Sequence, residues 1–361
     1  MNLVPYSVDL EITPEDEEET IAELRQVMLE LSAMVRQKHG MAMKGTHAKA
    51  VGLVKGCLIV DDDLPSELAQ GLFAKPATYD ALVRYAPGPP EKLSDKASGQ
   101  RGMSIKLLGV AGPHIPESDE TTTQDFVLAV DPAFNASTAK SFLALFRKTG
   151  AQTPRFPEGA IIAASRIARG AEAVLEAVGL ESANLKFLGR PPRHPVSDPY
   201  YSQTPIRFGK YVGKIAVFPS EDTLKIIGAP EVDTGDDDVF RHVTQQYFLR
   251  NEARYEVRVQ LCTDLRTMPI DDASVVWPEA DSPYRRLATL IIPPQQAYSE
   301  ARREYFDDGL AFNPAHATID HRPLGSINRA RMEVYKHTTS YRRRSNGAAA
   351  VEPKFIADVP D

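Results

Sequence analysis

The sequence predicts an α+β fold in which about eight antiparallel strands form a barrel with flanking helices. Residues 255–261 alternate apolar and polar side chains, which is typical of a half-buried antiparallel strand. Helix-like, alanine-rich segments interrupt the strands, and a further helix follows them. The chain has no internal repeat and no Gly/Ser linker, so we expect a single domain over residues 1–361.

An N-terminal helix is expected at about residues 14–39. Thr13 can cap its first turn, Pro14 suits the first helical position, and acidic residues follow. Apolar residues then recur at steps of three and four, and they predict one face that packs on the barrel or on a neighbouring subunit. These residues are Ile21, Leu24, Met28, Leu31 and Val35.

Runs of β-branched and apolar residues predict the other strands. These runs are 50–60, 81–85, 103–110, 125–130, 210–218 and 286–292. Segments rich in helix formers predict helices at 136–148, 158–178, 294–306 and 328–344. Proline-rich stretches at 86–90 and 190–199 are interpreted as surface connections within the domain.

The charge balance argues against nucleic acid as the main partner, because 49 acidic residues outnumber 42 lysines and arginines and give a net charge of -7. The two cysteines, Cys57 and Cys262, lie in apolar runs and are interpreted as small buried residues in a reducing compartment. The N-terminus has no basic region before an apolar core, and no apolar run reaches roughly 18 residues. We therefore expect a cytoplasmic protein with no export signal and no membrane span.

The helix at 328–344 carries Arg331 and Tyr335 four residues apart, so both side chains share one face and the guanidinium can reach the phenol. Tyrosine has an ordinary pKa of about 10 and becomes an anionic ligand only where a fixed cation or a metal favours the phenolate. Arginine supplies such a charge permanently. The same spacing also occurs in packed surface pairs, so the spacing alone does not identify a site.

A second segment, Lys44-Gly45-Thr46-His47-Ala48-Lys49, lies far from this helix in the sequence. Together with Arg331 and Tyr335 it resembles the haem site of catalases, where a distal histidine stands in an H-A-K segment and a proximal tyrosinate follows an arginine by four residues. The resemblance extends from about Lys44 to Gly347 and implies a catalase-like, eight-stranded antiparallel β-barrel. Four further segments keep the order of that family: Val83-Arg84-Tyr85, Arg101-Gly102-Met103-Ser104-Ile105-Lys106, Phe126-Val127-Leu128-Ala129-Val130-Asp131-Pro132 and Val276-Trp277-Pro278.

The resemblance implies a role for each matched residue. His47 would shuttle a proton between the two oxygens of a peroxide. Tyr335 would be the iron ligand of haem b, and Arg331 would keep the phenol ionised. The haem propionates would be held by Arg84, Arg342 and Lys44, the last at a position where catalases carry arginine.

Besides Lys44, three positions differ from the catalase pattern. Catalases hold peroxide with a distal asparagine, and the best match here is Thr123, whose hydroxyl can donate one hydrogen bond. The serine that supports the distal histidine in catalases is replaced by Ala86. Thr46, directly before His47, resembles the threonine of catalase-related allene oxide synthases, which rearrange fatty-acid hydroperoxides.

These features lead us to expect a haem-dependent peroxidase that reduces hydrogen peroxide or an organic hydroperoxide, with a small organic reductant and weak or no catalase activity. The alternatives are a fatty-acid hydroperoxide isomerase or lyase, a true small catalase, and a haem carrier or sensor with little turnover. By analogy with the family we expect a homo-oligomer such as a dimer. His316 and His321 match a zinc site only weakly and are interpreted as structural.

Overall fold

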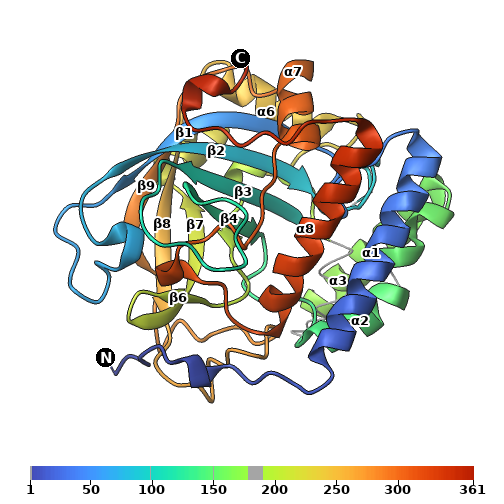
Figure 1. Ribbon diagram of the computed structural model, residues 1–361. Coiled ribbons are helices and arrows are strands. Elements are labelled where there is room, and N and C mark those ends of the chain that lie inside the picture. Colours follow the sequence, from blue (N-terminus) through green and yellow to red (C-terminus); the bar gives the residue numbers. More distant parts are fainter. Residues whose placement is uncertain (1, 98, 149, 178–189) are drawn as a thin grey trace.

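A closed antiparallel β-barrel forms the centre of the computed structural model, which describes residues 2–97, 99–148, 150–177 and 190–361 (Figure 1). All strands belong to one sheet with the order β5-β4-β3-β2-β1-β9-β8-β7-β6. Strand β5 pairs with both β4 and β7, so the eight strands other than β6 close into a barrel. The predicted eight-stranded antiparallel barrel with flanking helices is confirmed.

The strands are β1 (Gly52–Val60), β2 (Thr78–Pro87), β3 (Arg101–Leu108), β4 (Thr123–Ala129), β5 (Tyr200–Tyr201), β6 (Ile206–Phe208), β7 (Tyr211–Pro219), β8 (Ala253–Leu261) and β9 (Arg285–Ile292). The α-helices are α1 (Glu17–His39), α2 (Ala139–Lys148), α3 (Glu158–Ala177), α5 (Glu221–Ile227), α6 (Val239–Phe248), α7 (Glu300–Arg303) and α8 (Ser326–Asn346). Shorter helical turns are η1 (Val8–Leu10), η2 (Gly71–Phe73), η3 (Gly150–Arg155), η4 (Pro195–Ser197), η6 (Ile319–His321) and η7 (Ile356–Asp358), with a π-helical turn at η5 (Glu304–Gly309).

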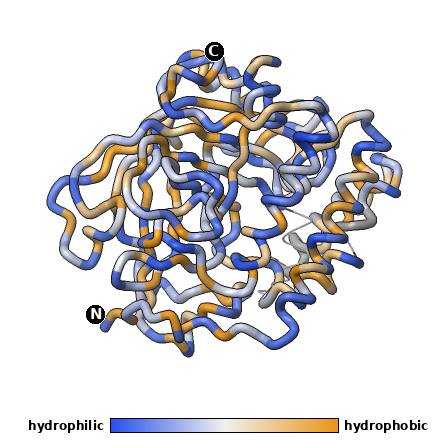
Figure 2. Tube along the Cα trace, viewed as in Figure 1, coloured by the Kyte–Doolittle hydropathy of each residue, from blue (hydrophilic) through white to orange (hydrophobic). Residues whose placement is uncertain are grey.

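The barrel interior is filled by the inward-facing apolar side chains of its strands. Figure 2 colours the trace by residue hydropathy and shows hydrophobic stretches along these strands. In β8 the predicted alternation is confirmed over residues 255–259, where Tyr255, Val257 and Val259 are buried and the two residues between them are half-buried. It fails at Gln260, which is 1% exposed because its amide donates to the carbonyls of Trp277 and Ser282. The hydroxyl of Tyr85 on β2 lies 2.9 Å from that of Tyr255, so even the polar tips inside the barrel have partners.

Helix α1 starts at Glu17, three residues later than predicted, because residues 14–17 form a turn closed by the Glu17 amide on the carbonyl of Pro14. Its apolar face is confirmed by the burial of Leu24, Met28 and Leu31. That face packs against α2 and α8 rather than directly on the barrel strands. Figure 1 shows α8 between the barrel and α1, so α8 has one side toward each.

Two stretches differ from the predictions because their backbones bond to residues outside their own segments. Of the helix predicted at 294–306, only α7 and the following π turn form, since Gln295 donates its amide to Phe248 and Ala297 accepts from Leu53. The predicted surface connection 190–199 contains buried residues at 195–198, because the carbonyls of Pro195 and Val196 accept from buried tyrosine hydroxyls. Sequence reasoning also missed β5, β6, α5 and α6.

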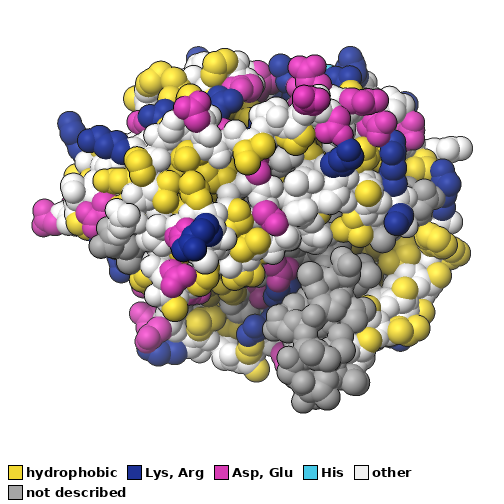
Figure 3. Space-filling view, turned by 90° about the horizontal axis from the view of Figure 1, so that it is seen from below, with side chains coloured by type: hydrophobic (Ala, Val, Ile, Leu, Met, Phe, Trp, Pro, Cys, Tyr) yellow, Lys and Arg dark blue, Asp and Glu magenta, His cyan; other side chains and the backbone are white. Residues whose placement is uncertain are grey.

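The remaining predictions concern one helix, Ala86, the two cysteines and a membrane span. The helix predicted at 158–178 is α3, and Val178 lies outside the described residues. Ala86, predicted to lie in a surface connection, is a buried residue of β2. Cys262 is buried as predicted, but Cys57 is only half-buried, and both thiols are free. Among the helices described, none combines the length and the apolar composition needed to span a bilayer. Acidic and basic side chains are interspersed on the face shown in Figure 3.

Candidate functional site

One face of α8 forms the first wall of the candidate site. The helix follows Gly325, whose φ of 86° and whose distance to the backbone of Ile270 exclude a side chain, since a Cβ would lie 2.5 Å from the Ile270 oxygen. Arg331, Tyr335 and Arg342 then recur at steps of four and seven, which places them on one side of the helix. The guanidinium of Arg331 reaches β4, where its Nη2 donates to the carbonyl of Val127 at 3.4 Å.

The loop that carries His47 forms the second wall. His47 has a φ of 55°, an uncommon conformation for a residue with a side chain. Three hydrogen bonds hold it there: its amide donates to Gly88 at 2.9 Å, the next amide donates to Pro89 at 3.0 Å, and Arg84 Nη2 donates to its carbonyl at 2.8 Å. Strained backbone of this kind is concentrated at functional sites in proteins.

The imidazole of His47 is held in one tautomer. Its Nδ1 lies 3.2 Å from the carbonyl oxygen of Ala86, and a carbonyl can only accept, so Nδ1 carries the proton and Nε2 keeps a free lone pair. Burial, together with the cations Arg84 and Arg331, lowers the pKa of His47 to about 4. The ring is therefore a neutral base at physiological pH. Where catalases have a serine that supports the histidine, this chain has Ala86, and the backbone carbonyl of Ala86 contacts Nδ1 instead.

Gly102 on β3 gives the imidazole its space. A Cβ at this position would lie 2.7 Å from Cε1 of His47, closer than carbon atoms approach. In the sequence Gly102 stands inside a segment matched to catalases, and no role was predicted for it. A glycine inside a strand is the signal that could have identified it, because such a glycine marks a close approach by another group.

Arg331 and Tyr335 meet as their spacing predicts. The guanidinium carbon lies over the phenol ring, 5.5 Å from the ring centroid. The charge of Arg331 also helps to lower the pKa of His47, so helix α8 and the His47 loop are close enough to interact electrostatically. Among the described residues no carboxylate forms an ion pair with Arg331.

The three predicted propionate-binding cations come together at one end of the site. Lys44 Nζ and Arg342 Nη2 donate to the same carbonyl oxygen of Leu310, each at 3.3 Å. Burial, with the charges of Arg342 and Arg84, lowers the pKa of Lys44 well below its ordinary value. Of the three, Arg84 is the one that pairs with a carboxylate in the part of the chain that the structure describes: Asp307 Oδ1 accepts from its Nε at 2.8 Å. Sequence reasoning missed Asp307.

The two threonines of the prediction lie in different places. Thr46 is half-buried and precedes His47 in the loop, as the sequence requires. Thr123 lies in the ladder of β4 opposite Leu108, six residues along β3 from Gly102, which is roughly 20 Å at about 3.3 Å per residue. The strand begins two residues earlier than predicted, which takes Thr123 into the sheet. We correct the assignment of Thr123 beside His47.

Thr123 lies beside a buried charged cluster, hereafter the Lys106 cluster, which is formed by Lys106, Asp125 and His316. Lys106 Nζ lies 2.9 Å from Asp125 and 3.4 Å from the hydroxyl of Thr123. His316 lies between two carboxylates, at 3.0 Å from Asp125 and 2.8 Å from Asp119. Burial and the Lys106 charge oppose protonation of His316, but the two carboxylates outweigh them and raise its pKa to about 9.

This cluster predicts a loss of stability in alkali. A histidine whose pKa is raised on folding stabilises the fold fully below its ordinary pKa of 6.5, and that contribution disappears as the pH rises through about 9. We expect the difference in free energy of unfolding between wild type and His316→Gln to be largest near pH 6 and to shrink by pH 9–10. Urea titrations across this range measure it, and a difference that does not change with pH would contradict the assignment.

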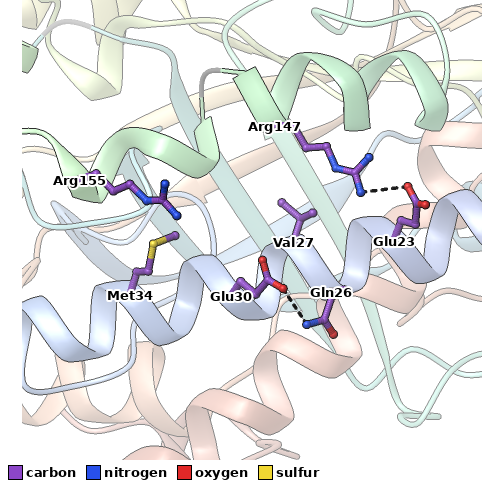
Figure 4. Close-up of a pocket in the computed structure, with 7 residues that line it drawn as sticks. All are labelled: Glu23, Gln26, Val27, Glu30, Met34, Arg147 and Arg155. Carbon is purple, nitrogen blue, oxygen red and sulfur yellow. Dashed lines mark hydrogen bonds and ion pairs between the residues drawn. The ribbon is translucent and has the colours of Figure 1, made fainter.

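A surface groove elsewhere in the molecule is lined by none of the predicted site residues (Figure 4). It has a volume of about 300 Å³ and lies between α1, α2 and η3. Most of its charged groups already have partners, since Arg147 pairs with Glu23 and Gln26 donates to Glu30. A smaller cavity of about 30 Å³ lies beside Arg331 and Asn328 and borders the candidate site. We therefore locate the functional site by its side chains, between α8 and the His47 loop.

No protein-family model and no curated protein matches the chain. Solved structures do. A fungal catalase is 18% identical over 90% of this chain and 65% of its own, with a TM-score of 0.55. A bacterial catalase is 12% identical over 96% and 64%, with a TM-score of 0.53. Catalase A from Saccharomyces cerevisiae is 14% identical over 86% and 62%, with a TM-score of 0.51. The chain thus has the fold of these catalases and spans slightly less than two thirds of their length.

Proposed function

We propose that this chain, which shares the fold of catalases, is a haem-dependent peroxidase that reduces hydrogen peroxide or organic hydroperoxides. The observation that carries the proposal is the meeting of three segments remote in sequence: the loop with His47, strand β2 with Arg84, and helix α8 with Arg331 and Tyr335. An acid–base group, a phenol beside a permanent cation, and a group of further cations are the parts that a tyrosinate-bound haem requires.

The charges at the site support haem b as the cofactor. Among the described residues neither Lys44 nor Arg342 forms an ion pair with a carboxylate, and burial and neighbouring cations lower the pKa of both groups, that of Arg342 to about 10. Two anionic groups beside them would favour their charged forms. Haem b carries two propionates. In addition, the Nε atom of Arg342 is buried and has no hydrogen-bond partner, so a donor is available there. Lys44, Arg84 and Arg342 would hold the propionates, and Tyr335 would bind the iron.

The haem iron would supply the redox chemistry that breaks the O–O bond of the peroxide. His47 would take the proton from the inner peroxide oxygen at Nε2 and return it to the outer oxygen, which leaves as water or an alcohol. The carbonyl of Ala86 keeps Nε2 unprotonated for this role, and the low pKa keeps the ring neutral. Arg331 would stabilise the phenolate of Tyr335 through the whole cycle.

The same arrangement supports weak catalase activity. Catalase turnover needs a second peroxide to be held beside the histidine. Thr123, the best sequence match for the residue that does this, lies in the ladder of β4 with its Oγ1 facing Lys106. A small organic molecule would then be the reductant.

The proposal is tested with protein reconstituted with haem b and supplied with hydrogen peroxide. We expect fast oxidation of a phenolic dye and little oxygen release, measured side by side with a spectrophotometer and an oxygen electrode. Rapid oxygen release would instead identify a small catalase. Haem binding with neither activity would identify a carrier or sensor, and consumption of a fatty-acid hydroperoxide without dye oxidation would identify an isomerase or lyase.

A further inference from the structure

We propose that Asn328 is a positioning residue that holds the guanidinium of Arg331 against Tyr335. Because the amide of Asn328 is neutral, it does not compensate the positive charge of Arg331. This inference rests on the proposed function, because Tyr335 is taken as the iron ligand. Asn328 lies in the first turn of α8, three residues before Arg331, and is 2% exposed. Its Oδ1 accepts from Arg331 Nη1 at 3.2 Å.

The hydrogen bonds of Asn328 determine which way its amide points. Nδ2 donates to the carbonyl of Pro205 at 3.1 Å and to that of Leu324 at 3.0 Å. Both partners can only accept, so the NH2 group must face them and the oxygen must face Arg331. The hydroxyl of Thr204 lies 3.1 Å from the same oxygen and 3.2 Å from the carbonyl of Ser202, and its proton can serve either. The amide is therefore locked by the segment 204–205 and by its own helix.

The guanidinium of Arg331 is in turn held at three points. Asn328 accepts from Nη1, the carbonyl of Val127 accepts from Nη2, and the ring of Tyr335 lies below the plane of the group. Every partner is a neutral group in the described structure. Without Asn328, the carbonyl of Val127, at 3.4 Å, and the ring of Tyr335 would remain to orient the side chain.

A neutral partner has an electrostatic consequence that is clear from the neighbouring arginine. Arg329, two residues away on α8, is surrounded by the carboxylates of Glu11, Glu17 and Asp271, which neutralise its charge. Arg331 has no such partner among the described residues. A carboxylate in place of Asn328 would compensate its charge, and the stabilisation of a phenolate at Tyr335 would fall.

The other titratable groups around Arg331 do not neutralise its positive charge. His47 is neutral, since burial lowers its pKa to about 4. Asp125 and His321 line the small cavity beside Arg331 and Asn328. Asp125 is paired with Lys106 and His316, and burial lowers the pKa of His321 to about 3, which keeps it neutral. The cavity of about 30 Å³ is large enough for a water molecule.

The test is the pH at which the ferric, tyrosinate-type visible spectrum of the haem-loaded protein is lost on acidification. In Asn328→Asp we expect this midpoint to move to higher pH by about one unit, because the added carboxylate makes the phenol easier to protonate. In Asn328→Ala, which removes the acceptor and adds no charge, we expect a smaller shift in the same direction. Unchanged midpoints in both variants would overturn the inference.

Arg329→Gln is the matched control, since it removes a cation from the same turn of α8 but from the side that faces α1 and the N-terminal segment. We expect it to lower thermal stability and to leave the midpoint unchanged. Failure of the proposed function gives a different result, because wild type would then show no spectrum that depends on Tyr335. If Asn328→Asp does not fold, as circular dichroism would show, Asn328→Ala still decides the question.

Discussion

Replacement of His47 by alanine is expected to slow the reaction of the haem-loaded protein with peroxide by about 10²–10⁴-fold, the usual contribution of a positioned acid–base group. The physical reason is the loss of the imidazole that lies beside Gly102 and keeps Nε2 unprotonated. Haem content should stay near that of wild type, because the group assigned to the iron is Tyr335. Stopped-flow mixing with hydrogen peroxide measures the rate, and the visible spectrum measures the haem.

The pH dependence gives this prediction a second readout. Because the pKa of His47 is lowered to about 4, the imidazole is neutral at pH 5–8, and the wild-type rate should be level there and decline below about pH 4–5. His47→Ala should lack this decline. Gly102→Ala tests the position of the imidazole while His47 is still present. The added methyl group would displace Cε1 of His47 and should slow the reaction. Wild-type rates in His47→Ala would refute the mechanism.

Replacement of Tyr335 by phenylalanine is expected to abolish tyrosinate ligation, so that haem is lost or binds with a different spectrum. Phenylalanine keeps the ring beside Arg331 but has no oxygen for the iron, and the half-buried Arg331 is then left without an anionic partner. The measurements are the haem-to-protein ratio after desalting and the ferric visible spectrum.

Tyr341→Phe provides the matched control for this variant. Tyr341 lies on the same helix six residues further along, and it is half-buried like Tyr335. Its replacement removes one phenol from α8 without removing the proposed ligand, so haem content and spectrum should match wild type. An unaltered high-spin ferric spectrum in Tyr335→Phe would show that the iron ligand is another residue.

Much of the fold follows from local patterns in the chain. The alternation in β8 and the apolar stripe of α1 are properties of neighbouring residues, and both elements form within three residues of their predicted bounds. The segment 294–299 was predicted to be helical because its composition permits a helix. Its amide at Gln295 and its carbonyl at Ala297 instead bond to Phe248 and Leu53, which are remote in sequence. Burial of residues 195–198 likewise involves a remote partner, because the carbonyl of Val196 accepts from the hydroxyl of Tyr255 on β8.

The sequence by itself determined which chemical groups the chain carries and how they are spaced: a histidine in the loop, an arginine and a tyrosine one helical turn apart, and three separate cations. Helical spacing is local, so Arg331 and Tyr335 could be paired before the fold was known. Only the tertiary structure decided which groups meet. Arg84 reaches Asp307 across 223 positions of the chain and Arg331 reaches Val127 across 204, whereas Thr123 is held in the β4 ladder. Such contacts depend on strand register and helix packing over the whole chain, which no short stretch of sequence contains.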